Sequence, residues 1–417
     1  MVKLDLTQVN NVFRKKEHEY QEDVPEEEDV DASEFEDDDY VPVKTKNRRP
    51  KEDNFTQQRL ASINPVFTPK SVLPIYLLVA AVFVIVGGCL LAQSSRVDEI
   101  TMFYQDCVTA APKDNFQDMP DDHFNYIFHN HKDFNTKPQW RFVDDPSDDS
   151  NERGTCQIRF TTPADLKKTV YVNYVLEKFA ANHRRYVLSF SEDQIRGKRP
   201  SLHDVRSNTG INCKVLGHDS EGKLIYPCGL IANSMFNDSY PFELQNVQDS
   251  TKNYPLTNKR INWHSDKKRY KKTKYNHTEV VPPPYWAKAF PNGYNETNMP
   301  NINEWEEFQN WMRPAAFDKQ TKLIRKNTND TLPAGEWQID IGLHWPVTEY
   351  NGKKGVFITH GSSIGGRNPF LGEVYLIGGC ICAAMAIVLA LAWVMGGRKI
   401  ADPTALSWNK DDSFRLK

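Results

Sequence analysis

Two long apolar runs interrupt an otherwise polar chain. Val72–Ala92 contains twenty-one residues without a charged side chain, and Val374–Met395 is a second uncharged run of similar length. An α-helix rises about 1.5 Å per residue, so the first run is about 31 Å long and matches the roughly 30 Å hydrocarbon core of a bilayer. A helix also satisfies its own backbone hydrogen bonds, as lipid requires. The pattern therefore predicts two transmembrane helices, with both chain ends on the same side of the membrane.

The pattern between the two runs is mostly that of β-strands. Alternating or β-branched stretches predict strands at 155–161, 170–176, 185–190, 335–345 and 356–360. Turn residues such as Asn351-Gly352 favour antiparallel pairing, so we expect a β-sandwich with long loop insertions, especially at 246–300. A helix is predicted at 303–312, with Asn303 as its cap and acidic residues in its first turn. The expected fold is two transmembrane helices plus a mainly β luminal or extracellular domain.

Positive charges beside the apolar runs predict the orientation. They are Lys44, Lys46, Arg48, Arg49, Lys51, Arg59 and Lys70 before the first run, and Arg398 and Lys399 after the second. Lys and Arg resist translocation, so both termini should be cytosolic and residues 93–369 luminal or extracellular. The first run lies too far from Met1 for a cleaved signal peptide and should be an uncleaved anchor.

Composition divides the rest of the chain. Gln21–Tyr40 holds twelve acidic residues and little that could pack, which is typical of a disordered tail. Five boundaries follow from these patterns. The division is a cytosolic tail, acidic then basic (1–54), an interfacial juxtamembrane segment (55–71), transmembrane helix 1 (72–92), the luminal or extracellular domain (93–369), transmembrane helix 2 (370–395) and a cytosolic tail (396–417).

The cysteines fall into two groups according to their predicted surroundings. Three of the seven lie in the apolar runs, where a thiol behaves as a small apolar group. Cys107, Cys156, Cys213 and Cys228 lie in the expected lumen, an oxidising compartment in which an even set indicates disulfide bonds. Of three possible connectivities we expect Cys107–Cys156 and Cys213–Cys228, because the second pair closes a short loop rich in turn residues. A zinc site would need closely spaced ligand pairs such as C-x-x-C, and the sequence has none.

Acceptor sequences for N-glycosylation support the same orientation. Asn237, Asn276, Asn295 and Asn329 each begin an Asn-x-Ser/Thr triplet, and all four lie between the apolar runs. We expect these asparagines to carry glycans. A fifth triplet begins at Asn54, on the side predicted to be cytosolic, and should stay unmodified.

Motifs for catalysis are weak. Gly361–Gly365 fits the G-x-S-x-G pattern of hydrolases, but the chain enters the membrane before any later Asp or His could complete a triad. Lys267–Lys274 carries six positive charges in eight residues. It is predicted to be a solvated loop, with contacts to lipid headgroups, an acidic partner loop or glycans as the alternatives. The chain has no P-loop string and no clustered histidine ligands, and its net charge of −3 gives no reason to expect nucleic acid.

The two apolar runs also suggest how the helices meet. Small residues recur at a spacing of four, Gly88 with Ala92 and Gly379 with Ala383, and such stripes let transmembrane helices approach closely. Neither run holds an ionisable residue that could line a transport pathway, and two helices cannot enclose one. Any transport must therefore be performed by another chain.

Several motifs resemble one known family. They are FTQQRL at 55–60, VFTPKSVLP at 66–74, NHRRYV at 182–187, CGLIANSMFND at 228–238, NWMRPAAF at 310–317 and GGRNPFLG at 365–372. This combination resembles the non-catalytic β-subunits of type IV P-type ATPases, the phospholipid flippases, and is most similar to the fungal ligand-effect-modulator member. The resemblance implies a glycosylated, disulfide-bonded β-sandwich ectodomain between two spans, paired with an ATPase that moves phospholipid toward the cytosolic leaflet.

The resemblance also implies a role without catalysis. The chain would be a regulatory and chaperone subunit, needed for assembly of the ATPase, its export from the endoplasmic reticulum and its transport cycle. ATP and magnesium would bind the partner subunit, and this chain would have no cofactor and no catalytic residue. The expected locations are the endoplasmic reticulum, the Golgi or endosomes, and the plasma membrane. A membrane-anchored receptor or adhesion glycoprotein and a membrane-anchored ecto-hydrolase are the alternatives.

Overall fold

The computed structural model describes Phe55, Gln58 and residues 68–396, apart from 132, 148–152, 208–209 and 363–364. The predictions for the acidic and basic tail (1–54), for most of the juxtamembrane segment (55–67) and for the C-terminal tail (397–417) lie outside these residues. The chain divides into two units, Met1–Pro65 and Val66–Lys417, and the second contains the elements described below.

Two long apolar helices are the first and last elements of the described sequence and pack against each other. Helix α2 spans Pro69–Ser95 and helix α10 spans Phe370–Met395, and each is long and apolar enough to cross a membrane. Proline is well tolerated at the first position of a helix, and α2 begins at Pro69, ahead of the apolar run. It then continues through Pro74, where only one backbone donor is missing. Both helices are therefore slightly longer than their uncharged runs.

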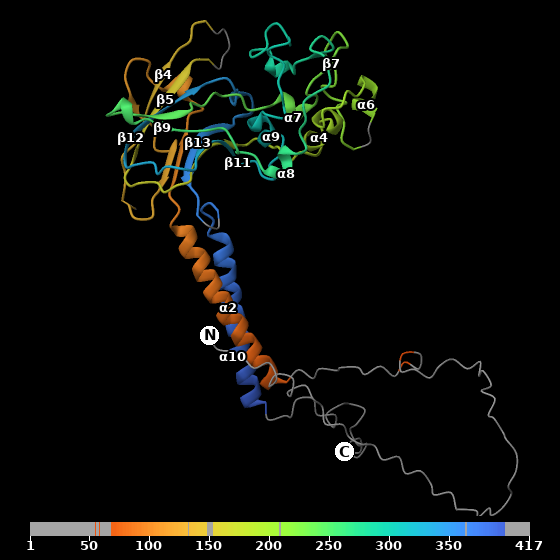
Figure 1. The fold of residues 1–417 in the computed structure, drawn as a ribbon. Coiled ribbons are helices and arrows are strands. Elements are labelled where there is room, and N and C mark those ends of the chain that lie inside the picture. Colours follow the sequence, from red (N-terminus) through yellow and green to blue (C-terminus); the bar gives the residue numbers. More distant parts are fainter. Residues whose placement is uncertain are drawn as a thin grey trace, which may run out of the picture. The chain divides into compact units, whose positions relative to one another are not determined.

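Two antiparallel sheets form the centre of the ectodomain (Figure 1). The first has the order β11 (Gln320–Asn327), β6 (Val170–Glu177), β13 (Lys353–His360), β1 (Glu99–Phe103) and β3 (Phe124–Ile127). The second has the order β2 (Gln117–Asp118), β4 (Gln139–Val143), β5 (Thr155–Thr162), β12 (Gly335–Gly342), β8 (Glu243–Asn246) and β9 (Tyr254–Pro255). A small parallel pair joins β10 (Val280–Val281) to β7 (Leu224–Ile225).

Alternation of apolar residues explains the two sheets. In β5 every second residue is buried, and Ile158 pairs with Ile339 of β12. From the other sheet, Val172 and Ile358 enter the same buried cluster, so the two sheets pack face to face around one core. Four of the five predicted strands are confirmed. So is the predicted class, two transmembrane helices with a mainly β domain between them.

The strand predicted at 185–190 is wrong. Helix α4 occupies Arg184–Val187, and the chain then turns. Burial in this segment does not alternate, because Arg184 and Arg185 are exposed together and the next three residues are half-buried together. Such one-sided burial suits a helical turn packed on the domain surface. The Tyr186 hydroxyl fixes it through a 2.9 Å hydrogen bond with the Ser234 hydroxyl.

The helix predicted at 303–312 begins later than expected. Helix α9 spans Glu306–Trp311, so the acidic first turn is as predicted but Asn303 is not the cap. The Gln309 side-chain amide donates to the backbone carbonyls of Ile302 and Asn303 at 2.7 and 3.0 Å. These bonds hold the preceding segment as a turn and delay the start of the helix.

Helices α4 (Arg184–Val187), α6 (Leu202–Ser207), α7 (Leu230–Asn233), α8 (His264–Lys267) and α9 (Glu306–Trp311) gather on the side of the ectodomain away from β4, β5 and β12 (Figure 1). The other short helices are α3 (Cys107–Ala110), which contacts β4, η1 (Ser250–Lys252), which contacts β8, and α5 (Glu192–Ile195), η2 (Pro284–Trp286) and η3 (Thr348–Tyr350). The predicted insertion at 246–300 is mostly irregular and contributes only short elements such as β9, α8, β10 and η2. Irregular segments of this length need side-chain and disulfide anchors, which the next section describes.

Candidate functional site

The two membrane helices pack through small residues spaced by seven. The buried residues are Ala80, Gly87 and Ser94 on α2, and Gly372, Gly379 and Ala386 on α10. A repeat of seven is the spacing that keeps one seam of a helix against its neighbour along its length. The predicted stripe of Gly88 and Ala92 is wrong, since both residues are exposed. Gly379 does lie in the seam, but Ala383 is only half-buried.

The backbones of these helices are in direct contact at the glycines. A Cβ atom added to Gly87 would lie 2.9 Å from the Gly372 carbonyl oxygen, and one added to Gly372 would lie 2.7 Å from Leu91 Cγ. Phe83 and Tyr375 pack edge to face beside this contact, with ring centroids 5.2 Å apart. Many of the other apolar side chains of the two helices are exposed. Ile75, Leu78, Ile85, Ile377, Ile381 and Ile387 are among the exposed ones. This outer face is available to lipid or to helices of another protein.

The ends of the two helices are tied to the first strand. The Asn368 N–H donates to the Ser94 hydroxyl at 2.9 Å. The Arg367 N–H donates to the Glu99 carboxylate at 3.3 Å, while the Arg367 guanidinium donates to the Val97 carbonyl at 3.4 Å. Burial raises the pKa of the Glu99 carboxyl above its ordinary value. Both chain connections between helix pair and ectodomain are therefore held by hydrogen bonds.

A second polar group secures the base of the sheet next to this junction. The Asp98 N–H donates to His360 Nε2 at 3.1 Å, and the Asp98 carboxylate accepts from the His129 N–H at 2.7 Å. Burial alone would raise the pKa of Asp98, but the hydrogen bonds and charges of His360 and His129 leave it below its ordinary value. The first residues of the ectodomain are thereby fixed to β13.

A buried ion pair joins β13 of the first sheet to the segment that precedes β8. The Lys354 ammonium lies 3.0 Å from the Asp238 carboxylate, and neither side chain is exposed to solvent. The Tyr104 hydroxyl donates to the same carboxylate at 3.0 Å, and the N–H groups of His344 and Trp345 donate to it at 2.6 and 2.7 Å. A buried charge is tolerated only with such partners. Asp238 thus holds the end of the CGLIANSMFND motif against β13 and against the segments that follow β1 and β12.

The structure contains both disulfide bonds expected from the sequence. Cys107, in α3 after the first strand of one sheet, is bonded to Cys156 in β5 of the other. Cys213 is bonded to Cys228 across fifteen residues. In the loop-entropy account, cross-links of these lengths stabilise by about 4 and about 3 kcal/mol. The thiols of Cys89, Cys380 and Cys382 are free, as their place in the membrane helices implies.

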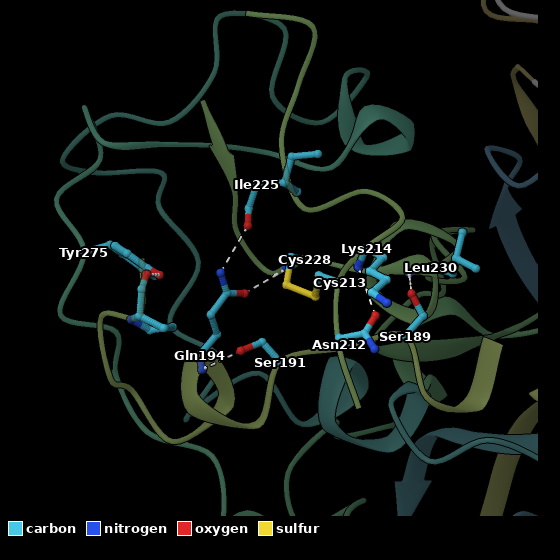
Figure 2. The surroundings of a disulfide bond; sticks show 11 residues. Ser189, Ser191, Gln194, Asn212, Cys213, Lys214, Ile225, Cys228, Leu230 and Tyr275 are labelled. Atoms are coloured by element: carbon cyan, nitrogen blue, oxygen red, sulfur yellow. Dashed lines mark hydrogen bonds between the residues drawn. A yellow bond between two sulfur atoms is a disulfide. The ribbon is translucent and has the colours of Figure 1, made fainter. Parts of the chain in front are cut away.

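A buried glutamine accompanies the second disulfide (Figure 2). The Gln194 side chain is 1% exposed. Its carbonyl oxygen accepts from the Cys228 N–H at 2.9 Å, and its amide donates to the Ile225 carbonyl at 3.2 Å. One side chain therefore satisfies two backbone groups of an irregular segment. Sequence patterns gave no signal for this role, because the bonded groups are more than thirty residues away along the chain.

The four candidate glycosylation sites are all exposed. Asn237, Asn276, Asn295 and Asn329 each have a side chain open to solvent. The Asn295 side-chain oxygen accepts from the N–H and the hydroxyl of Thr297, at 2.9 and 2.8 Å. Each site therefore lies in an accessible turn or loop. The presence of glycans at these positions stays a prediction.

The basic segment Lys267–Lys274 is partly built into the fold and is not simply a solvated loop. Lys267 lies 2.8 Å from Glu306, and the Arg269 Nε donates to Glu192 at 2.9 Å. Hydrogen bonds from Arg269, supported by Arg196, outweigh the effect of burial and leave the pKa of Glu192 below its ordinary value. The remaining lysines of the segment, Lys268, Lys271, Lys272 and Lys274, are exposed. These four keep the positive character of the segment.

The G-x-S-x-G string at 361–365, for which we expect no catalytic role, lies just ahead of α10. Ser363 lies outside the described residues, and residues 365–369 after it form no helix before α10 begins. Nor does any trio of His, Cys, Asp or Glu come together in a metal-binding arrangement within the described part of the chain. The described residues form packing surfaces and the hydrogen-bonded anchors that hold them.

These features define a two-span membrane protein with a disulfide-bonded β-sandwich between its spans. The family model described as the LEM3 (ligand-effect modulator 3) family or CDC50 family matches residues 90–399, so the chain belongs to this family. The resemblance predicted from the motifs is confirmed.

Similar proteins come from fungi and animals. The Saccharomyces cerevisiae phospholipid-transporting ATPase accessory subunit LEM3 is 68% identical over 98% of this chain and 100% of the relative. The Chaetomium thermophilum phospholipid-transporting ATPase accessory subunit CDC50 is 37% identical, covering 87% of this chain and 91% of the relative. Cell cycle control protein 50A of Bos taurus is 31% identical, covering 82% and 89%. The similarity thus includes both helices and the ectodomain.

Proposed function

We propose that this chain is the non-catalytic accessory subunit of a phospholipid-translocating P-type ATPase. One observation carries the proposal: a relative that is 68% identical over its whole length bears the name phospholipid-transporting ATPase accessory subunit. The role is assembly of the ATPase, its export from the endoplasmic reticulum and support of its transport cycle, which moves phospholipid inward. ATP and magnesium bind the partner.

Two surfaces suit this role. The outer apolar face of α2 and α10 packs against membrane helices of the partner, and the ectodomain packs against its luminal loops. Hydrogen bonds of Ser94, Glu99 and Arg367 at the junction support a coupling between the two contacts. Each chain stabilises the other by mass action, which makes their export interdependent. The subunit biases the cycle only where its contacts differ between states of the partner.

The proposal includes an orientation. Both termini are cytosolic, the ectodomain is luminal or extracellular, and its four exposed Asn-x-Ser/Thr sites carry glycans. The basic residues flanking the apolar runs support this orientation. The protein resides in the endoplasmic reticulum, in the Golgi or endosomes, and at the plasma membrane.

Affinity purification tests the partnership. The tagged full-length chain is extracted from native membranes in mild detergent, and co-purifying proteins are identified and quantified. We expect a type IV P-type ATPase in a 1:1 ratio, as for a heterodimer. A matched sample tagged on an unrelated two-span glycoprotein controls for adventitious capture. Recovery of the chain without any P-type ATPase contradicts the proposal.

Glycosidase treatment tests the orientation. Release of N-glycans should lower the apparent mass of the wild-type chain, and the shift should vanish when all four acceptor asparagines are replaced by glutamine. Asn54→Gln serves as the control and should leave the shift unchanged. A glycan on Asn54 would place the N-terminus in the lumen and reverse the proposed topology.

A further inference from the structure

One candidate glycosylation site lies at the wall of an aromatic cavity. The cavity has a volume of about 360 Å³, and Asn237 lines it together with Phe179, Tyr285, Trp345 and Tyr350. The rings of Phe179 and Trp345 lie 5.4 Å apart, and those of Trp345 and Tyr350 lie 6.0 Å apart. Aromatic walls with a few polar groups are typical of small-molecule sites, whose volumes are roughly 300–1,000 Å³.

The backbone on both sides of Asn237 is fixed. Phe236 is 4% exposed and stacks on Tyr174 with ring centroids 4.0 Å apart. Asp238 is 4% exposed and accepts hydrogen bonds from the backbone N–H groups of His344 and Trp345. Asn237 is exposed between these two buried neighbours. Its side chain therefore leaves the domain from a rigid position at the cavity.

We propose that the first N-acetylglucosamine of a glycan on Asn237 occupies this cavity. A pyranose ring presents a face of C–H groups that packs on aromatic rings, while its hydroxyl and acetamido groups accept and donate hydrogen bonds. The cavity offers both kinds of contact, because the charged side chains of Lys288 and Glu349 also line it. The inference rests on the luminal orientation proposed above.

Attachment to the wall makes this occupancy favourable even with weak contacts. A tethered group meets its site at an effective concentration in the millimolar range or above, without the entropy loss of free association. Occupancy of the cavity by the glycan on Asn237 therefore does not depend on a partner protein. The glycan would then cover aromatic side chains that otherwise face water, and would act as part of the folded domain.

Asn329 provides a contrasting site on the same chain. It lies in the turn after β11, between the exposed residues Thr328 and Asp330. Asn276 and Asn295 both line another cavity, which includes the charged side chains Lys272 and Lys274. We therefore expect the glycan on Asn237 to be shielded by aromatic contact and the glycan on Asn329 to extend into solvent.

Native deglycosylation measures this shielding. The full-length glycoprotein, purified alone and with its ATPase, is treated with a peptide N-glycosidase, and conversion of each acceptor asparagine to aspartate is followed by mass spectrometry. We expect release at Asn237 to be at least ten times slower than at Asn329 in both samples. Tyr285→Ala should abolish that difference, and this ring is 67% exposed, so its loss leaves the core intact. Trp263→Ala, at an equally exposed ring, is the matched control and should preserve the difference.

The outcomes separate this inference from the proposed function. Equal release at the two sites, or slow release that Tyr285→Ala leaves unchanged, overturns the cavity contact. Slow release only in the presence of the ATPase also overturns it, because the partner is then the shield. An unmodified Asn237 beside three modified sites overturns the inference and leaves the orientation standing. Four unmodified sites overturn both.

Discussion

Individual residues in this protein act mainly as internal anchors. Lys354 and Asp238 lie 116 positions apart in the sequence, and Gln194 binds backbone groups 31 and 34 positions away. Periodicity and spacing report on neighbours along the chain, so they gave no signal for these contacts. The disulfide pairs could be predicted from the sequence because an even number of cysteines in an oxidising compartment indicates disulfide bonds. The residue type of Lys354 or Gln194 does not indicate its partner in this way.

Removing the Lys354 charge should strongly destabilise the ectodomain. In Lys354→Met the Asp238 carboxylate stays buried without its counter-charge, and we expect the free energy of unfolding to fall by about 3–5 kcal/mol. Lys113→Met is the control, because Lys113 pairs with Asp144 but its side chain is 63% exposed. Its effect should be below about 1 kcal/mol. Thermal and denaturant unfolding of the purified full-length variants measures both. Similar losses in the two variants would contradict the role given to the buried pair.

Glu192 should contribute to the acid sensitivity of the fold. Arg269, with Arg196, leaves its pKa in the folded state below the ordinary value of 4.5. As the pH falls through 4.5 the unfolded chain takes up a proton before the folded chain does. The stabilisation is therefore present above that pH and is lost as the pH falls through the folded pKa.

The variant Glu192→Gln should lose less stability than the wild type on acidification. The measurement is the change in the unfolding midpoint between pH 7 and pH 4. Glu221→Gln is the control, since that side chain is 75% exposed, and it should behave as the wild type does. An unchanged acid dependence in Glu192→Gln would rule out this contribution.

Among the elements, long or strongly patterned segments were predictable and short ones were not. The apolar runs predicted both membrane helices, and alternating or β-branched stretches predicted strands β5, β6, β12 and β13. The segment at 185–190 alternates over too few residues to distinguish a strand from a helical turn, and packing around Tyr186 decided the outcome. The helix seam was missed because small residues occur at several spacings. Only the structure selects the spacing of seven.

A larger side chain in that seam should separate the two helices. The Cβ of Gly87→Leu would meet the Gly372 backbone, which cannot move aside without shifting the helix. We expect a destabilisation of about 1–3 kcal/mol, as for overpacked cores. Gly88→Leu is the matched control, because no atom lies within 4 Å of a Cβ added there. Unfolding midpoints and yields of the full-length chain, purified without partner, compare the two. Equal loss in both variants would contradict the described seam.

At the scale of the whole molecule, the described part of the chain offers packing surfaces, and no three of its His, Cys, Asp or Glu side chains are arranged to hold a metal ion. Its two spans contain no polar path for a lipid headgroup, and an apolar outer face surrounds the glycine seam. The ectodomain is stabilised by two disulfide bonds and a buried ion pair. Side chains such as Gln194 also form hydrogen bonds with backbone groups of its irregular segments. The architecture was predictable because membrane insertion, oxidation and strand alternation leave plain sequence patterns. The identity of the partner came from similarity to other proteins.

This chain supports phospholipid transport by an ATPase and catalyses nothing alone. The direct test is lipid-stimulated ATP hydrolysis and aspartyl-phosphate formation by the co-purified ATPase, measured with this subunit, without it, and for the subunit alone. We expect activity and phosphoenzyme in the complex, a severe loss of assembled and active ATPase without the subunit, and no hydrolysis by the subunit. Hydrolysis by the subunit alone, or unchanged assembly and activity of the ATPase in its absence, would contradict the account.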